Sequence, residues 1–112
     1  MRLTSSIWVS AYLRRCQHEG AFGAVVRKGA EEAGAIFIKI SRLDGTCDLY
    51  GPAPQAMVEE PEDAGWGGRT FEALLTGCAE AEADERVARE RGFDPDLWLV
   101  EIEDRQGRAF LD

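Results

Sequence analysis

Hydrophobic and polar positions near the start of the chain follow the spacing of an amphipathic helix. We expect this helix to begin with Ser5 or Ser6 as its N-cap and to end near Glu19, because Gly20 is a typical stop signal. Its apolar side consists of Val9, Tyr12, Leu13 and Cys16, with Trp8 at the border. A helix with one apolar side packs against another element of the fold.

The next part of the chain predicts three antiparallel strands. Residues Phe22–Lys28 and Ala35–Arg42 are rich in β-branched and aromatic side chains, and a glycine-bounded turn joins them. The dipeptide Asp44-Gly45 is expected to supply the two positive φ angles of a two-residue hairpin loop, from which Thr46–Tyr50 returns as an antiparallel strand. Prolines follow, and because they cannot donate ladder hydrogen bonds, the third strand is predicted to end near its tyrosine.

The second half of the chain begins with a long acidic loop, residues 53–68, rich in proline and glycine. Residues 69–76 alternate as a strand would, but two adjacent leucines also fit a short helix, so both alternatives stay open. The segment EAEADERVARERG, residues 80–92, predicts a helix with a thin apolar face that lies on a surface. Leu97–Ile102 predicts the last strand, because large apolar side chains follow one another there.

This order of elements predicts an α+β fold in a single domain, residues 1–112. We expect an antiparallel or mixed sheet of four or five strands with both helices on one face. Strand alternation directs Ile36, Ile38 and Ile40 to one side of the sheet, which the helices are expected to cover. Periodicity does not fix the order of the strands in the sheet.

The charge of the chain argues against nucleic acid as a partner. The net charge of −8 is the sum of +2 from residues 1–52 and −10 from residues 53–112. A strongly acidic surface repels phosphate backbones, so we expect no nucleic-acid partner. No stretch approaches the ~20 apolar residues of a membrane-spanning helix, and the start lacks a signal-peptide pattern. We therefore expect a cytoplasmic protein without a membrane partner.

Residue types that commonly carry catalysis or bind metals form no known motif in the sequence. Cys16, Cys47 and Cys78 lie far apart without a C-x-x-C pair, which predicts buried thiols rather than disulfides or a zinc site. His18 is the only histidine, and no serine lies in a G-x-S-x-G motif, so a hydrolase triad has no support. We expect no catalytic residue, no metal and no cofactor.

The second face of the predicted sheet suggests a contact surface. By strand alternation, Phe37 and Tyr50 point away from the isoleucines, together with Arg27 and Lys39. Two helices are too few to cover both faces, so an aromatic and aliphatic patch is expected to be exposed. We therefore expect a small non-enzymatic interaction or structural protein, with a second copy covering the patch in a homodimer. Trp66 in the long loop is the alternative cover.

A second function class is also consistent with the sequence. Arg15, Arg27, Lys39 and Tyr50 carry groups that bind anions or polar ligands, and the loop of residues 53–68 is long enough to form a lid. This combination is typical of a small-molecule binder or an enzyme. Convergence of these side chains in a deep pocket would favour the ligand-binding class, and a flat sheet face would favour the protein contact.

Three segments of the chain resemble a known bacterial family. They are RLTSSIWVSAYLRRC, RKGAEEAGAIFIKISRLDGTCDLYGPAPQ and ARERGFDPDLWLVEIEDRQGRAFL. In these segments, which occur in order and span most of the chain, the sequence is similar to the family known as domain of unknown function 1491, found chiefly in alphaproteobacteria. The resemblance implies a small bacterial protein with no established activity, cofactor or catalytic residue, so it assigns no functional residue.

Overall fold

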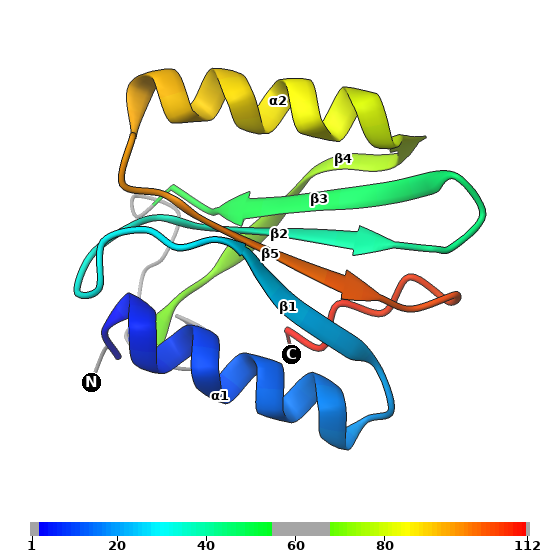
Figure 1. Ribbon diagram of the computed structural model, residues 1–112, viewed down its shortest axis with the longest axis horizontal. Coiled ribbons are helices and arrows are strands. Elements are labelled where there is room, and N and C mark those ends of the chain that lie inside the picture. The colour runs from blue at the N-terminus through cyan, green and yellow to red at the C-terminus, as the bar shows by residue number, and fades with distance from the viewer. Residues whose placement is uncertain (1–2, 55–67, 112) are drawn as a thin grey trace.

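Two helices and a mixed five-stranded sheet form one domain in the computed structural model, which describes residues 3–54 and 68–111 (Figure 1). The predicted α+β class is confirmed. Along the chain the elements are α1 (Ser5–His18), β1 (Phe22–Arg27), β2 (Ile36–Ser41), β3 (Thr46–Pro52), β4 (Phe71–Ala79), α2 (Glu80–Phe93) and β5 (Trp98–Glu103). Most of the predicted acidic loop, including Trp66, lies outside the described residues.

The order of the strands in the sheet is β1-β5-β2-β3-β4, with β5 inserted between β1 and β2. β5 runs parallel to β2 and antiparallel to β1, whereas the pairs β2–β3 and β3–β4 are antiparallel. The prediction that the first two strands form an antiparallel pair is therefore wrong. β1 instead forms one edge of the sheet, and β4 forms the other.

The turn between β1 and β2 explains why these strands do not pair. Gly29 and Gly34 both lie against Asp96, and a Cβ added to either glycine would clash with the Asp96 carbonyl oxygen. The Ala30 N–H donates to the same oxygen at 2.9 Å, and the Trp98 indole N–H donates to the Ala30 carbonyl at 2.8 Å. The two glycines thus permit a close approach of the segment that enters β5, rather than closing a tight hairpin.

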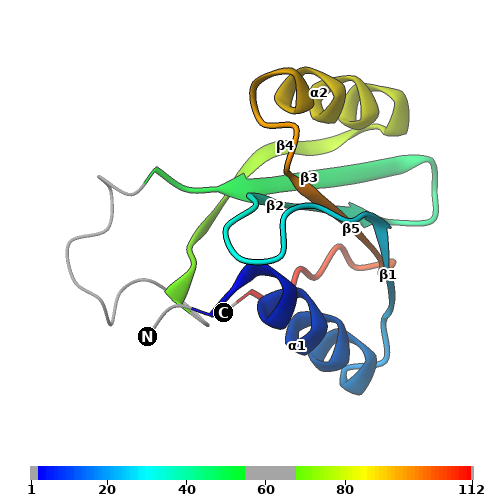
Figure 2. The ribbon, with the colours of Figure 1, turned by 60° about the vertical axis from the view of Figure 1, so that its left-hand side comes forward.

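The helices cover opposite faces of the sheet, so the prediction that both lie on one face is wrong (Figure 1 and Figure 2). α1 packs Trp8, Tyr12 and Cys16 against the isoleucines of β2. On the other face, Val87 of α2 belongs to a cluster with Phe37, Leu49, Leu97 and Leu99. Because β2 alternates isoleucine with Phe37, both faces are apolar and each needs a cover.

α1 starts with a different cap from the one predicted. The N-cap is Thr4, whose hydroxyl accepts a hydrogen bond from the Ile7 N–H at 3.3 Å, so the assignment to Ser5 or Ser6 is wrong. The buried Ser5 hydroxyl instead donates to the Gly34 carbonyl at 2.6 Å. Ser5 thereby ties the start of the helix to the turn that precedes β2.

The hairpin between β2 and β3 has a loop of three residues rather than two. The Arg42 N–H donates to the Thr46 carbonyl at 3.0 Å, which leaves Leu43, Asp44 and Gly45 in the loop. Leu43 and Gly45 have positive φ angles of 64° and 91°, so the assignment of positive φ to Asp44 is wrong. The Asp44 carboxylate accepts hydrogen bonds from the Thr46 N–H at 2.9 Å and from its hydroxyl at 2.6 Å, as in Asx turns.

The end of β3 differs from the prediction, and the structure resolves the two alternatives for residues 69–76. β3 continues to Pro52, beyond its expected end near Tyr50, and the segment of residues 69–76, which fitted a strand or a helix, contributes to strand β4. Within residues 3–54 and 68–111, neither helix is long and apolar enough to cross a membrane.

Candidate functional site

The residues predicted to bind a ligand lie on both sides of the sheet. Tyr50 packs against the core beneath α1, the helix that carries Arg15. Arg27 and Lys39 lie on the α2 side, where their cross-strand neighbours belong to the α2 cluster. The expectation that Tyr50 shares a face with Phe37 is wrong, because the ladder sets Tyr50 opposite an isoleucine of β2. The sheet therefore separates Arg15 and Tyr50 from the other two candidates.

Phe37, the centre of the predicted contact surface, is covered by the protein's own helix. Its side chain is only 5% exposed and packs with Val87 of α2. The prediction of an exposed patch on this face is wrong, because α2 takes the place assigned to a second copy.

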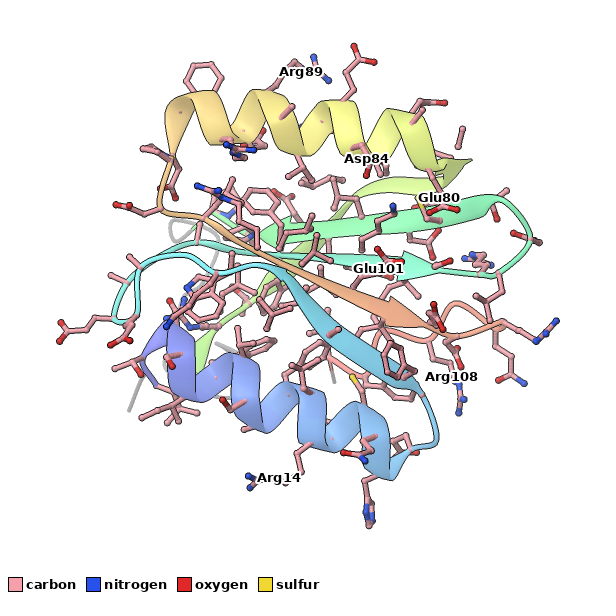
Figure 3. All side chains as sticks on the ribbon, in the orientation of Figure 1. Arg14, Glu80, Asp84, Arg89, Glu101 and Arg108 are labelled. Atoms are coloured by element: carbon pink, nitrogen blue, oxygen red, sulfur yellow. The ribbon has the colours of Figure 1, made fainter. Side chains whose placement is uncertain are left out.

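Lys39 is buried and fully engaged by carboxylates. Its Nζ lies 3.1 Å from Glu80 Oε1, 3.2 Å from Asp84 Oδ1 and 3.9 Å from Glu101 Oε1, and these acids lie between α2 and the sheet in Figure 3. Burial lowers the pKa of Lys39, but the bonds to Glu80 and Asp84 and the charge of Glu101 outweigh it, so its pKa is raised overall. Lys39 thus stays an ammonium group that anchors α2, and it is unsuited to act as a base or nucleophile.

The three cysteines are free and buried, as predicted. Cys47 and Cys78 face each other across β3 and β4 with their Sγ atoms 3.7 Å apart. Burial and the neighbouring Cys78 raise the pKa of the Cys47 thiol to about 12, so it is not an activated nucleophile. Within residues 3–54 and 68–111, no group of His, Cys, Asp and Glu side chains is arranged to hold a metal ion.

The open edge at β1 is the surface feature that sequence reasoning missed. Among residues 3–54 and 68–111, β1 has a neighbouring strand on one side only, and its three large apolar side chains face solvent: Phe22 is 66% exposed, Val25 41% and Val26 56%. Val25 pairs with Val100 and Arg27 with Leu99, so β1 uses two residues where β5 uses one, and Val26 forms a bulge. An edge strand with free backbone groups and apolar side chains is a template for another strand.

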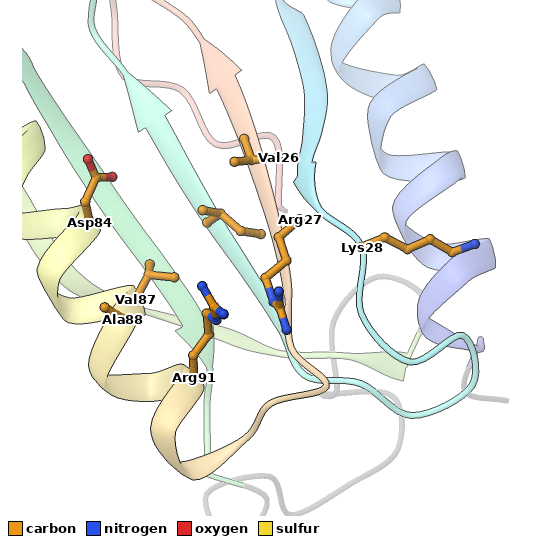
Figure 4. A pocket seen from close by; sticks show the side chains of 8 residues that line it. Val26, Arg27, Lys28, Asp84, Val87, Ala88 and Arg91 are labelled. Carbon is orange, nitrogen blue, oxygen red and sulfur yellow. The ribbon is translucent and has the colours of Figure 1, made fainter.

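A groove of about 550 Å³ runs between β1 and α2 (Figure 4). Its apolar lining includes Val26, Val87 and Leu99, and Arg27 and Arg91 extend into it from the strand and the helix, while Lys28 points away. Arg27 is held in place because its Nη2 donates to the Pro95 carbonyl at 2.7 Å. The groove is therefore apolar with Arg27 and Arg91 at one end, and the Asp84 carboxylate lines it away from these two arginines.

A second groove, of about 420 Å³, lies on the α1 side of the same strand. It is lined by Leu13 and Arg14 of α1 and by Phe22 and Gly23 of β1. Gly23 permits this arrangement, because a Cβ at that position would come within 2.8 Å of Leu13 Cδ2. The open edge thus has a hollow on each face, which leaves room for the side chains of an added strand.

Charges are ordered along this edge. Glu103 of β5 is level with Phe22 at the start of β1, whereas Arg27 stands at its end, level with Leu99. The side chains of residues 99, 101 and 103 point to the same face of β5. Because Arg27 pairs with Leu99, Arg27 and Glu103 lie on that same face of the sheet. The edge is therefore acidic at one end and basic at the other.

Comparison with known proteins matches residues 3–112 to the family described as "Protein of unknown function (DUF1491)". A solution structure of protein Atu0922 from A. tumefaciens has 48% identity and a TM-score of 0.78, covering 92% of this chain and 86% of that one. A crystal structure and an NMR structure of a DUF1491 family protein from Caulobacter crescentus CB15 each have 38% identity and a TM-score of 0.78. Each alignment covers 99% of this chain and 94% of the Caulobacter chain. No curated protein matches the chain.

Proposed function

Because the chain belongs to the DUF1491 family of proteins of unknown function, we propose a role from its own surface: a small non-enzymatic interaction protein. Its contact site is the open edge of β1, which accepts an extended polypeptide segment as an additional strand. The observation that carries this proposal is the exposure of Phe22, Val25 and Val26 on a strand with a free side.

Strand addition accounts for both the backbone and the side chains of this edge. An added strand would satisfy the outward N–H and C=O groups of β1, and it would remove the three apolar side chains from water. The two flanking grooves would receive alternate side chains of that strand, since successive side chains point to opposite faces. The basic end of the α2-side groove favours a segment with an acidic side chain there.

The ligand-binding class has weaker support from the described residues. Arg15 and Tyr50 lie on the face opposite Arg27, and Lys39 is already bound by carboxylates. A single pocket formed by the four candidates is thus not available on this fold. We therefore favour the protein contact.

Site-specific photo-crosslinking in bacterial cells tests the proposal. A benzophenone amino acid replaces Phe22 in one variant and Phe93 in the other, since Phe93 is an aromatic residue of α2 with 88% exposure. We expect adducts with another polypeptide at position 22 and none at position 93. Val26→Lys should abolish the adduct at position 22, because a charged side chain would enter the apolar contact. Absence of adducts at position 22, or equal adducts at both positions, would contradict a contact at β1.

A further inference from the structure

We infer that the strand added at the open edge is β1 of a second copy of this chain, paired antiparallel about a two-fold axis. The inference rests on the proposed function and names its partner. It relocates the predicted homodimer from the covered Phe37 face to the edge of the sheet. The two five-stranded sheets would join into one continuous sheet.

The side chains of β1 fit this self-pairing. A two-fold axis normal to the sheet keeps each residue on its face, so a pairing centred on Ala24 places Gly23 opposite Val25 of the second copy. The same register brings Phe22 level with Val26 of the second copy, which covers the two most exposed apolar side chains of the strand. Ala24 and Gly23 are small, so nothing at the centre keeps the two strands apart.

Charge complementarity supports the same register. The bulge at Val26 brings Arg27 of the second copy close to the level of Phe22, the residue that pairs with Glu103. Glu103 and Arg27 of the second copy are then two strands apart, roughly 10 Å between Cα atoms, which long charged side chains can span once Arg27 exchanges its bond to the Pro95 carbonyl for the carboxylate. The two-fold repeats this pair, so each acidic end meets a basic end. A parallel pairing would instead bring like charges together.

The edge also limits the assembly to two copies. The bulge interrupts the regular ladder of β1 after Val25, so the pairing surface is short. The other edge of the sheet, β4, exposes no large apolar side chain, and a sheet with one usable edge forms a closed pair instead of a fibre. Because the surface is short, we expect an equilibrium that depends on concentration rather than a permanent dimer.

Sedimentation velocity of the full chain tests the inference, at concentrations from about 1 µM to about 500 µM. We expect a monomer–dimer equilibrium in the wild type and a monomer for Val26→Lys. Thermal unfolding of each variant verifies that it is folded.

A charge exchange keeps the test specific for the proposed register. Arg27→Glu and Glu103→Arg should each weaken the dimer about tenfold, because each places like charges together in both symmetric pairs. The double variant should return to within about threefold of the wild type, since it restores both pairs. Arg27→Glu also removes the bond to the Pro95 carbonyl, which Glu103→Arg cannot replace, so rescue reports on the interface alone.

Three outcomes overturn the inference. A dimer that persists in Val26→Lys uses another surface, and a double variant no stronger than either single variant contradicts the register. A wild type that is monomeric throughout, with position 22 crosslinked to a different polypeptide in cells, rules out the second copy and leaves the proposed contact at β1 intact. A monomer without any crosslink at position 22 contradicts both proposals.

Discussion

The two edges of the sheet meet solvent in different ways. On β4 the exposed side chains are small or polar, at Glu72, Ala73, Thr76 and Ala79. On β1 they are the large apolar side chains described above. A position at the edge is therefore not enough to explain the apolar surface of β1, since the same chain builds a protected edge on the other side.

The protection of β4 comes from bulges and from one buried carboxylate. Cys47 pairs with Cys78 and Leu49 with Leu75, so β4 uses one more residue than β3 between these two pairs. A second irregularity follows between Leu49 and Tyr50. Asp48 fills the first gap: its Oδ1 accepts from the Gly77 N–H and its Oδ2 from Arg42 Nη2, both at 2.7 Å. β1 has one bulge, and the side chain that this bulge presents is the apolar Val26.

Replacing Asp48 should damage the protected edge most. Asp48→Ala removes a buried acceptor from the Gly77 N–H and from Arg42, and we expect the free energy of unfolding to fall by about 2–3 kcal/mol. Asp48→Asn keeps an acceptor for Gly77 and should lose about half as much. Urea denaturation measures both values, and an Asp48→Ala variant as stable as the wild type would show that the bulges alone hold β4.

Alkaline pH should weaken the contact between β3 and β4. The pKa of the Cys47 thiol rises on folding from its ordinary value of 9.0 to about 12, because of burial and then the neighbouring Cys78. The native state thus holds the proton more tightly, so this stabilisation is complete below pH 9 and is lost between pH 9 and about 12. Urea denaturation at successive pH values should show a shallower loss for Cys47→Ala than for the wild type. If the stability of both proteins fell equally with rising pH, the Cys47 thiol would not be the cause of the alkaline loss.

Gly45 should contribute less, through the conformation of the β2–β3 hairpin on which β4 rests. Its φ is 91°, and apart from its two chain neighbours no described residue has an atom within 4 Å of an added Cβ, so Gly45→Val tests backbone strain. We expect a loss of about 1 kcal/mol or more, since a β-branched residue avoids positive φ. Gly92 in α2 also has open space but no positive φ, so Gly92→Val is the control that should not destabilise the protein. Equal melting temperatures of Gly45→Val and the wild type would contradict the strain.

Val26→Lys should change stability least and association most. Val26 is exposed in the isolated chain, so we expect the free energy of unfolding to change by no more than about 0.5 kcal/mol. The same substitution at the other edge, Thr76→Lys, should alter neither stability nor association. Melting temperatures and sedimentation of the two variants together separate a contact surface from ordinary surface. Loss of association in Thr76→Lys would show that the two edges do not differ in this way.

Local patterns in the sequence predicted the elements well and their arrangement poorly. Both helices and the strands at Ile36–Ser41 and Trp98–Glu103 lie where periodicity places them, because burial on one face imposes the spacing. Strand order depends on pairing between distant segments, such as β5 with β1 and β2. The glycines at 29 and 34 indicated a turn, but the fold uses them for close approach to Asp96, which no local rule distinguishes.

The candidate site was hidden for the same reason. Phe37 and Lys39 were recognised as residues of one face, but the fold covers that face with α2 and binds Lys39 to carboxylates from that helix. Val25 and Val26 look like ordinary strand residues in the sequence. Their exposure follows only when β1 is known to be the outermost strand.

Amide hydrogen exchange at a low and a high protein concentration tests most directly whether β1 is the edge that joins two copies. We predict that amides of residues 22–26 exchange more slowly at the high concentration, because the second copy would bond the outward groups of the strand. Amides of β4, residues 71–79, should exchange at the same rate at both concentrations. Unchanged exchange in β1, or slower exchange in β4 alone, would contradict a contact at the open edge.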